Sequence, residues 1–466
     1  MRDFTRPFRS CKSLTENRAG DPAQEKYLHV DSSLPGFAET GAVRRGSHVL
    51  FMVYSPMRFI ADLHIHSKYS LATSRDMSPE TIWKWAQLKG ITVIGTGDLT
   101  HPEWLRELKE KLEPAGNGLL RLKKKIETGD VPDACKKDVF FMLTGEISCI
   151  FRRKGKTRKT HCLVFVRDFT AAGKIRSALS RVGNLNSDGR PILGLDAKEL
   201  LKIVMDTVPD AFFVPAHAWT PHFSVFGAES GFDSLEECFE EQTPFIRAIE
   251  TGLSSDPPMN WRLSALDGLT LISNSDAHSP EKTGREANIF DTAISYDSIL
   301  HALGTGKGFT GTIEFFPEEG KYHFDGHRAC GISLSPKETL RHNYLCPVCG
   351  KKVTIGVLHR VEKLADREEG FSPPDAPLYY SIVPLPQILS HTLGVGAGSK
   401  AVRKAYFSLL SMLGNEFGIL MELPPGEIGD AGRPELAEAI SLMRSGKVNI
   451  TPGFDGEYGK VNISRW

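Results

Sequence analysis

The stretch "ADLHIHSKYS", residues 61–70, decides both the fold and the chemistry that this sequence can support. It places Asp62, His64 and His66 on alternate positions directly after the strand-like run "MRFI" at residues 57–60. Because side chains two residues apart on an extended strand point the same way, the two imidazoles can converge on one point. That geometry suits a metal ion, although a hydrogen-bonded histidine pair on an exposed strand fits the stretch equally well.

Length and charge bound the class of protein. At 466 residues, with about 100 to 200 residues per domain as the usual range, we expect two to four folded units. The 57 basic and 57 acidic side chains cancel, so the composition alone indicates neither a nucleic-acid nor a membrane partner. Any basic surface must therefore be local.

The cysteines and the hydropathy indicate the compartment. Eight cysteines in a chain of this length, without a signal peptide or regular spacing throughout, do not resemble a disulfide scaffold. No apolar run approaches the roughly 18 residues that a membrane span needs. We expect a soluble, cytoplasmic protein.

The first 56 residues are predicted to be a disordered N-terminal extension. They mix polar and charged residues and carry few strand or helix signals. The organised pattern begins at "MRFIADLHIH", so Met57 is a plausible alternative start of translation.

From Met57 onward, strand and helix signals alternate. Ser78 and Pro79 look like the N-cap and first position of a helix that Gly90 closes. Apolar runs at residues 91–94, 139–143, 163–166, 211–214, 246–249 and 269–272 predict strands, most of them separated by segments long enough for helices. This alternation is typical of a parallel sheet or barrel.

Metal-type ligands follow most of these strands. "GTGD" ends in Asp98, "LTGE" in Glu146, "VPAH" in His217, and "ISNSDAH" contains Asp276 and His278. In a barrel of parallel strands the carboxyl ends gather at one face, so these side chains would meet. A further candidate in "RKTHCLVFV", His161, precedes its strand, as expected if the segment after Glu146 turns back as a hairpin.

Any single one of these residues is more often a cap or a satisfied polar group. Eight candidates at six element ends would leave buried charge unless cations compensated it. A mixed histidine and carboxylate set suits zinc, manganese or iron, and magnesium less well. Eight ligands also exceed one centre, and paired metals are typical of phosphate-ester hydrolysis.

The ordered motifs "DLHIHS", "GTGD", "LTGE", "THCLVF", "PAHAW" and "SNSDAH" resemble those of the PHP (polymerase and histidinol phosphatase) family over residues 57–320. The resemblance implies an α/β fold, a distorted (β/α)7 barrel, and two or three divalent metals (zinc, manganese or magnesium). The implied ligands are His64, His66, Asp98, Glu146, His161, His217, Asp276 and His278.

One departure from the family pattern lies just after the first histidine pair. Many members carry a further histidine there, and "SKYSLAT" has none, which puts a third metal in doubt unless His101 substitutes. Asp62 shares the face of His64 and His66, and we expect it to orient a ligand without touching metal.

A second metal site is predicted beyond the barrel. "HRACG" and "CPVCG" give His327, Cys330, Cys346 and Cys349, the two ligand pairs of a closed structural zinc site. His323 is a rival for the fourth position. The other cysteines lack such pairing and are expected to be small buried residues.

The tail contains the glycine-rich stretch "LGVGAGSKAVRKAY", residues 393–406. It is not a phosphate-binding P-loop, because Ser399 separates Gly398 from Lys400. It resembles a helix-hairpin-helix element, in which backbone amides hold a nucleic-acid phosphate, although a plain turn between packed helices fits as well. Lys400, Arg403 and Lys404 would supply positive charge nearby.

Positive charge is concentrated in "FRRKGKTRKT", between Glu146 and His161. A charge run is usually a solvated face, but this one lies on a loop with both bases at expected metal ligands. We expect it to contact a nucleic acid in a salt-dependent manner. The residues are Arg152, Arg153, Lys154, Lys156, Arg158 and Lys159.

The whole succession, including "GTGDLTHP", "CPVCGKK" and "RVEKLADR", resembles the endonuclease Q family from Met57 to the C-terminus. The resemblance implies DNA repair by cleavage 5′ of deaminated bases (hypoxanthine, uracil, xanthine) or abasic sites, with Asp276 central to catalysis. The alternatives are a small-molecule phosphoesterase such as histidinol-phosphate phosphatase and a non-catalytic DNA-binding module.

The implied organisation has four parts: an extension at 1–56, the metal-dependent barrel at 57–320, a zinc-binding element with one structural zinc at 321–370, and a helical DNA-binding domain at 371–466. Damaged DNA is the expected partner, no membrane is involved, and protein partners in replication or repair are unknown.

Overall fold

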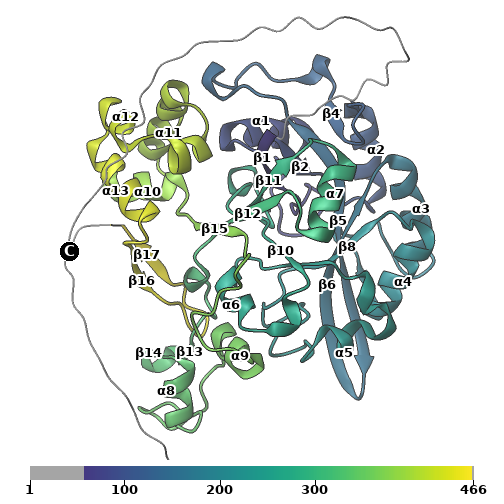
Figure 1. Cartoon of the computed structure of the whole chain (residues 1–466), viewed down its shortest axis with the longest axis vertical. Helices are drawn as coiled ribbons and strands as arrows, with labels where there is room; N and C mark the ends of the chain where they lie inside the picture. Colours follow the sequence, from purple (N-terminus) through teal and green to yellow (C-terminus); the bar gives the residue numbers. More distant parts are fainter. Residues whose placement is uncertain (1–56, 464–466) are drawn as a thin grey trace, which may run out of the picture. The chain divides into compact units, whose positions relative to one another are not determined.

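An 11-stranded mixed sheet organises the part of the chain that the computed structural model describes, residues 57–463 (Figure 1). Its strands are β1 (Met57–Asp62), β2 (Val93–Gly95), β3 (Leu112–Pro114), β4 (Leu120–Leu122), β5 (Phe140–Arg153), β6 (Lys156–Val166), β7 (Ile192–Leu193), β8 (Phe212–Pro215), β11 (Ala287–Thr292), β12 (Phe309–Glu314) and β15 (Leu378–Ser381). The expected extension at residues 1–56 lies outside the described residues.

Helices flank this sheet and follow its strands. They are α1 (Pro79–Lys89), α2 (Pro102–Lys111), α3 (Phe169–Leu179), α4 (Ala197–Thr207), α5 (Leu235–Phe239), α6 (Pro257–Trp261) and α7 (Tyr296–Thr305). The predicted caps of the first helix are confirmed: Ser78 accepts from the Thr81 amide, and Gly90 closes the helix at a φ of 97°.

The α/β class and the PHP-type barrel are confirmed, but the barrel is held partly by side chains. The strands β9 (Ala248–Glu250) and β10 (Thr270–Ile272) pair only with each other, in parallel. The side chain of Asn288 on β11 accepts a hydrogen bond from the Ser273 amide at 2.9 Å and donates one to the Ser273 carbonyl at 2.7 Å. The side chain of Asn274 accepts a hydrogen bond from the Leu63 amide at 2.7 Å. These amide side chains stand where backbone ladder bonds are missing, which accounts for the distortion.

The sheet is mixed rather than parallel throughout. β1, β2 and β5 pair in parallel, whereas β11 runs antiparallel to β1 and β6 antiparallel to β5. The expected hairpin after Glu146 is present, and it turns through Lys154 and Gly155, whose φ angles are 49° and 78°. Two central residues with positive φ match the right-handed twist of the strands.

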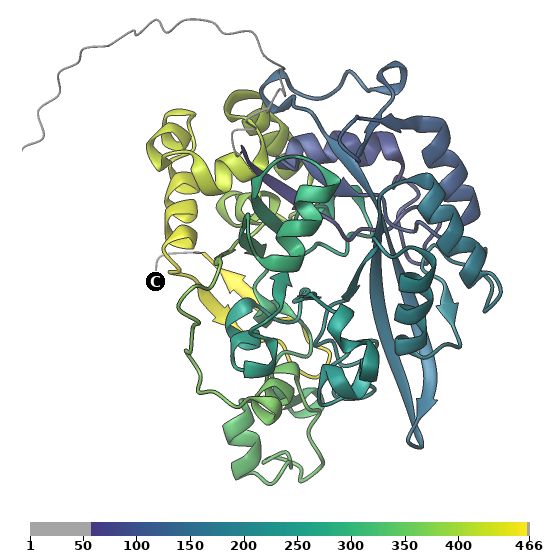
Figure 2. The same cartoon turned by 45° about the vertical axis from the view of Figure 1, so that its right-hand side comes forward.

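This hairpin is longer than the sequence predicts. Glu146 pairs with Leu163 in the middle of the ladder, so it does not end β5, and His161 lies inside β6 and does not precede it. The unbroken polar run at residues 152–160 hides the strand from an apolar-run criterion. Figures 1 and 2 show the hairpin extending beyond the neighbouring strands.

A small element follows β12. It contains β13 (Asp325–His327), β14 (Ile332–Leu334), α8 (Pro336–Arg341) and α9 (Val357–Leu364). Arg360 of α9 fastens it to the barrel by donating to the carbonyls of Phe226 and Phe232, at 2.9 and 2.8 Å.

The tail is mainly helical, as expected. It comprises α10 (Leu385–Leu393), α11 (Lys400–Leu413), α12 (Pro425–Asp430), α13 (Pro434–Arg444), and the paired strands β16 (Asn449–Thr451) and β17 (Lys460–Asn462). A buried ion pair of 2.6 Å between Lys89 and Glu416 ties it to α1. No helix in residues 57–463 is long and apolar enough to cross a membrane.

Candidate metal centre

Six of the eight expected ligands converge at the carboxyl-end face of the barrel. They form two groups. Within each group the ligand atoms lie within 4.8 Å of one another, and Glu146 belongs to both groups. The first group is His64, His66, Glu146 and Asp276, and the second is Glu146, His161 and His217.

Glu146 connects the two groups through its two oxygens. Oε2 lies 3.2 Å from His66 Nε2 and 3.5 Å from His64 Nε2, and Oε1 lies 2.6 Å from His161 Nδ1 and 3.1 Å from His217 Nε2. A carboxylate with one oxygen toward each group is the arrangement of a bridging ligand between two metal ions.

The charges in this cluster perturb the pKa values of its members. Burial alone would raise the pKa of Glu146, but His161, His64 and Arg190 outweigh it and hold that pKa well below its usual value. Burial lowers the pKa of His161 to about 4, so its imidazole is neutral, as a metal ligand must be.

The residues fit divalent metal ions. His64 Nε2 is buried and has no hydrogen-bond partner among the described residues, although it points at the carboxylates of Glu146 and Asp276. A buried ring nitrogen without a partner is costly unless another group satisfies it. The donor set of imidazoles and carboxylates suits zinc or manganese.

The two remaining expected ligands lie beside these groups. Asp98 is fully buried and accepts from the Ser67 amide at 2.7 Å and from the Ser67 and Ser70 hydroxyls, and it lies 3.2 Å from His66 Nδ1. It therefore orients the His66 ring through Nδ1, the nitrogen that does not face Glu146. The ring of His278 packs on that of His66 with centroids 4.4 Å apart, but His278 joins neither group.

His101 does not take the place of the missing histidine. Its Nδ1 accepts from the Trp104 amide and so caps α2, and its ring stacks on Tyr69 at 4.5 Å.

Two functional residues escape the sequence analysis. Glu250, 1% exposed, lies 3.0 Å from His64 Nδ1 and accepts from the His217 amide at 2.8 Å, so it positions one residue of each group. Arg190 lies 3.1 Å from Glu146 Oε2 and keeps a quarter of its side chain exposed. Glu250 directly follows an apolar run, as Asp98 does, so the same sequence pattern could have identified it as a site residue. No pattern in the sequence around Arg190 identifies it as a site residue.

Asp62 acts on the site indirectly, as expected of a residue that does not touch metal. It accepts from the amides of Ser275 and Gly284, at 3.1 and 2.9 Å, and so holds the loop that presents Asp276. Burial raises the pKa of Asp62 to about 6.

The backbone is strained where the ligands emerge. Asp98, His217 and Asp276 have φ angles of 50°, 28° and 46°, in the left-handed region that residues other than glycine avoid. Strain of this kind persists only where surrounding contacts enforce it, and it concentrates at functional sites.

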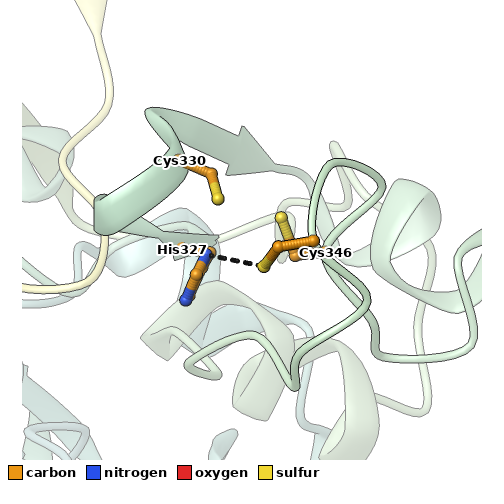
Figure 3. Close-up of side chains that lie close together, drawn as sticks. His327, Cys330 and Cys346 are labelled. Atoms are coloured by element: carbon orange, nitrogen blue, oxygen red, sulfur yellow. Dashed lines mark hydrogen bonds between the residues drawn. The ribbon is translucent and has the colours of Figure 1, made fainter.

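The second predicted metal site is also assembled. His327, Cys330, Cys346 and Cys349 form a group with ligand atoms within 4.8 Å, and Figure 3 shows His327, Cys330 and Cys346 turned toward one another. His327 Nδ1 lies 3.5 Å from Cys349 Sγ. The rival His323 is outside this group, where burial lowers its pKa to about 4.

The expected DNA-contacting residues divide into exposed cations and cations held against neighbouring segments. Arg152, Lys154 and Lys156 are exposed at the hairpin tip, and Lys400, Arg403 and Lys404 are exposed on α11. In contrast, Arg153 Nε donates to Asp196 at 2.9 Å, and Arg158 donates to the Gly231 carbonyl and stacks on Phe232. Lys159 is half-buried over Phe223.

Known proteins resemble this chain along most of its length. A family model described as the MJ0043 C-terminal domain matches residues 384–447. The protein MJ0043 of Methanocaldococcus jannaschii is 33% identical over 258 residues, which are 53% of this chain and 31% of that protein, so the chain spans less than a third of this relative.

Two solved structures have the same fold. The lesion-specific endonuclease PfuEndoQ from Pyrococcus furiosus is 32% identical with a TM-score of 0.76, over 87% of this chain and 96% of that one. A complex of endonuclease Q with a 27-mer duplex that carries an abasic lesion at the active site is 31% identical, with a TM-score of 0.75 over 88% and 97% of the two chains.

Proposed function

This chain belongs to the endonuclease Q family, and on that premise we propose that it is a metal-dependent DNA repair endonuclease. Its reaction is hydrolysis of the phosphodiester bond 5′ of a deaminated base (hypoxanthine, uracil or xanthine) or of an abasic site. The observation that carries the proposal is Glu146, whose two oxygens face two separate groups of candidate ligands.

In the proposed centre, His64, His66, Glu146 and Asp276 would hold one divalent metal ion, and Glu146, His161 and His217 would hold another. Bound metal ions lower the pKa of water and neutralise charge that develops on the phosphate in the transition state. Magnesium, manganese and zinc are the candidates.

The protein groups around this centre keep the ligands in place. Asp98 holds the His66 ring, Glu250 holds the His64 ring, and Asp62 fixes the loop before Asp276. Arg190 neutralises part of the charge of Glu146 and offers its exposed edge to a substrate phosphate.

The remaining elements serve DNA binding. The group of His327, Cys330, Cys346 and Cys349, called the Cys346 group below, holds one structural zinc. Its three thiolates and one imidazole close a tetrahedral shell and leave no open position. Exposed cations at the hairpin tip and on α11 contact phosphates on either side of the lesion. Damaged DNA is thus the proposed partner.

The rival functions explain less of the chain. A small-molecule phosphoesterase such as histidinol-phosphate phosphatase would need the barrel but neither the Cys/His zinc-binding group after it nor the long basic hairpin. A non-catalytic DNA-binding module would not need six convergent ligands in the barrel.

A nicking assay separates the three functions. Protein loaded with manganese, magnesium or zinc is incubated with a labelled duplex that contains one inosine, with an undamaged duplex, and with histidinol phosphate. We expect a single cut 5′ of the inosine, read from product length, and no cut in the undamaged duplex. Phosphate release alone would support the phosphatase, and binding of both duplexes without cleavage would support the binding module.

A further inference from the structure

An exposed leucine stands at the edge of the metal centre. Leu71 is 65% exposed, although the segment that carries it follows His66 directly. Single exposed leucines are ordinary on a protein surface, so what distinguishes Leu71 is its place in a segment fixed to the metal centre.

The backbone around Leu71 is held on three sides. Its amide donates to Asp188 at 3.1 Å, the neighbouring Ser70 hydroxyl donates to Asp98 at 2.9 Å, and the Ser74 amide donates to the His278 carbonyl at 2.8 Å. The side chain is therefore presented to solvent by a backbone fixed to both sides of the metal centre.

Leu71 occupies the apex of a strained turn. The Thr73 amide donates to the Ser70 carbonyl at 3.3 Å, and Ala72 has a φ of 61° at the position where such turns favour glycine. The strain places the leucine outward, and strained turns of this kind are retained where function requires them.

The segment 186–190 locks this turn to the ligands. Gly189 donates to the Tyr69 carbonyl at 2.9 Å, and any side chain at Gly189 would come within 2.2 Å of an Asp98 oxygen. The adjacent Arg190 contacts Glu146. Leu71 thus lies at a fixed place relative to the phosphate that the centre would cleave.

We propose that Leu71 is a wedge that enters the base stack of the duplex and fills the gap left when the damaged nucleotide is turned outward. The proposal rests on the proposed function. An enzyme that reads a base in a duplex must unstack it, and apolar side chains inserted between base steps offset that cost. Leu71 is accordingly a positioning residue and does not touch the reacting phosphate.

The test compares Leu71→Ala with the wild-type protein on two substrates with the same inosine. One is a fully paired duplex, and the other flanks the lesion with mismatches, so that its base is already unstacked. Leu378→Ala is the matched control, because Leu378 is 64% exposed and lies on β15. Single-turnover nicking rates are measured with manganese.

We expect Leu71→Ala to slow nicking of the paired duplex at least about tenfold and of the mismatched one less than about twofold. Leu71→Met should retain most of the paired-duplex rate, and Leu378→Ala should match the wild type. Fluorescence of 2-aminopurine placed next to the lesion should rise on binding to the wild type and less on binding to Leu71→Ala.

Wild-type rates for Leu71→Ala on the paired duplex, or an equal loss on both substrates, would overturn the wedge and leave the proposed function intact. Absence of lesion-dependent nicking by the wild-type protein on either substrate would instead overturn the proposed function.

Discussion

Glu250 lies 3.0 Å from Nδ1 of His64 and thereby determines that the other ring nitrogen, Nε2, faces Glu146 and Asp276. The carboxylate accepts a hydrogen bond from Nδ1–H, so Nε2 is left with the free lone pair that a metal ion requires. Asn274 donates to the same Glu250 oxygen at 2.9 Å, which keeps the carboxylate from turning away.

We predict that Glu250→Gln weakens binding of the first metal ion by about tenfold to a hundredfold, because the amide can present its NH₂ group to Nδ1 and favour the wrong tautomer. Titration of nicking activity with manganese measures the effect, and excess metal should restore much of the rate. Glu103→Gln, on the exposed face of α2, is the control. Unchanged metal dependence would show that Glu250 does not orient His64.

The Cys346 group gives a prediction that is independent of catalysis. Purified wild-type protein should contain one zinc that survives loss of the barrel ligands, and Cys346→Ser should lack it, because the serine hydroxyl does not replace a thiolate in a closed zinc site. Elemental analysis of both proteins measures this difference. Cys238→Ser, at a buried cysteine outside the group, should keep its zinc; a loss there would indicate unfolding rather than ligation.

If the basic hairpin contacts DNA, removing its charges should change how DNA affinity depends on salt concentration. The tip lies roughly 20 Å along the ladder from Glu146, at about 3.3 Å per residue, so its cations would meet phosphates away from the cleaved bond. Replacing Lys154 and Lys156 with Gln should reduce the slope of log affinity against log salt by about 1 to 2.

The control for the hairpin is Lys307→Gln, since Lys307 precedes β12 at the opposite end of the strands. Fluorescence anisotropy at several salt concentrations measures the slope. A slope that is unchanged in the double variant would remove the hairpin from the DNA interface.

A buried carboxyl pair predicts how stability depends on pH. Burial raises the pKa of Glu314 to about 8, and it raises that of Glu286 well above its usual value. In the unfolded chain both titrate near 4.5, so above that pH the folded protein binds more protons than the unfolded one. The stabilising contribution of this pair is therefore fully present below pH 4.5 and is lost as the pH rises toward 8.

We expect the contribution of this pair to the free energy of unfolding to decrease by up to about 2.7 kcal/mol per pH unit between pH 5 and 8, and Glu314→Gln to make this dependence shallower. Thermal melting at saturating metal in this range measures both proteins. Parallel curves for the wild type and Glu314→Gln would show that Glu314 is ionised in the folded state.

The strand-end rule predicts most of the candidate site, because backbone geometry alone brings the carboxyl ends of neighbouring strands together. It accounts for four of the six residues that converge, His64, His66, His217 and Asp276, whereas Glu146 and His161 lie inside the long β5–β6 hairpin. It does not separate ligands from residues that orient them: Asp98 and Glu146 both follow apolar runs, and only the packed structure shows Asp98 behind His66.

Other features depend on contacts between distant segments. Arg190 reaches Glu146 across 44 positions from a segment without regular pattern, and Arg153 is engaged by Asp196 although its neighbours are exposed. The mixed sheet depends on the β5–β6 hairpin and on the antiparallel pairing of β11 with β1, and the unbroken polar run of the hairpin resembles a charged loop in the sequence. Side-chain engagement of this kind is a tertiary property.

The most direct test of the account is the nicking rate of Glu146→Gln on an inosine-containing duplex, measured together with its affinity for that duplex. Because both groups of ligands share Glu146, we predict that nicking falls by at least about a thousandfold while DNA affinity changes by less than about threefold. Nicking near the wild-type rate would contradict a centre built around Glu146.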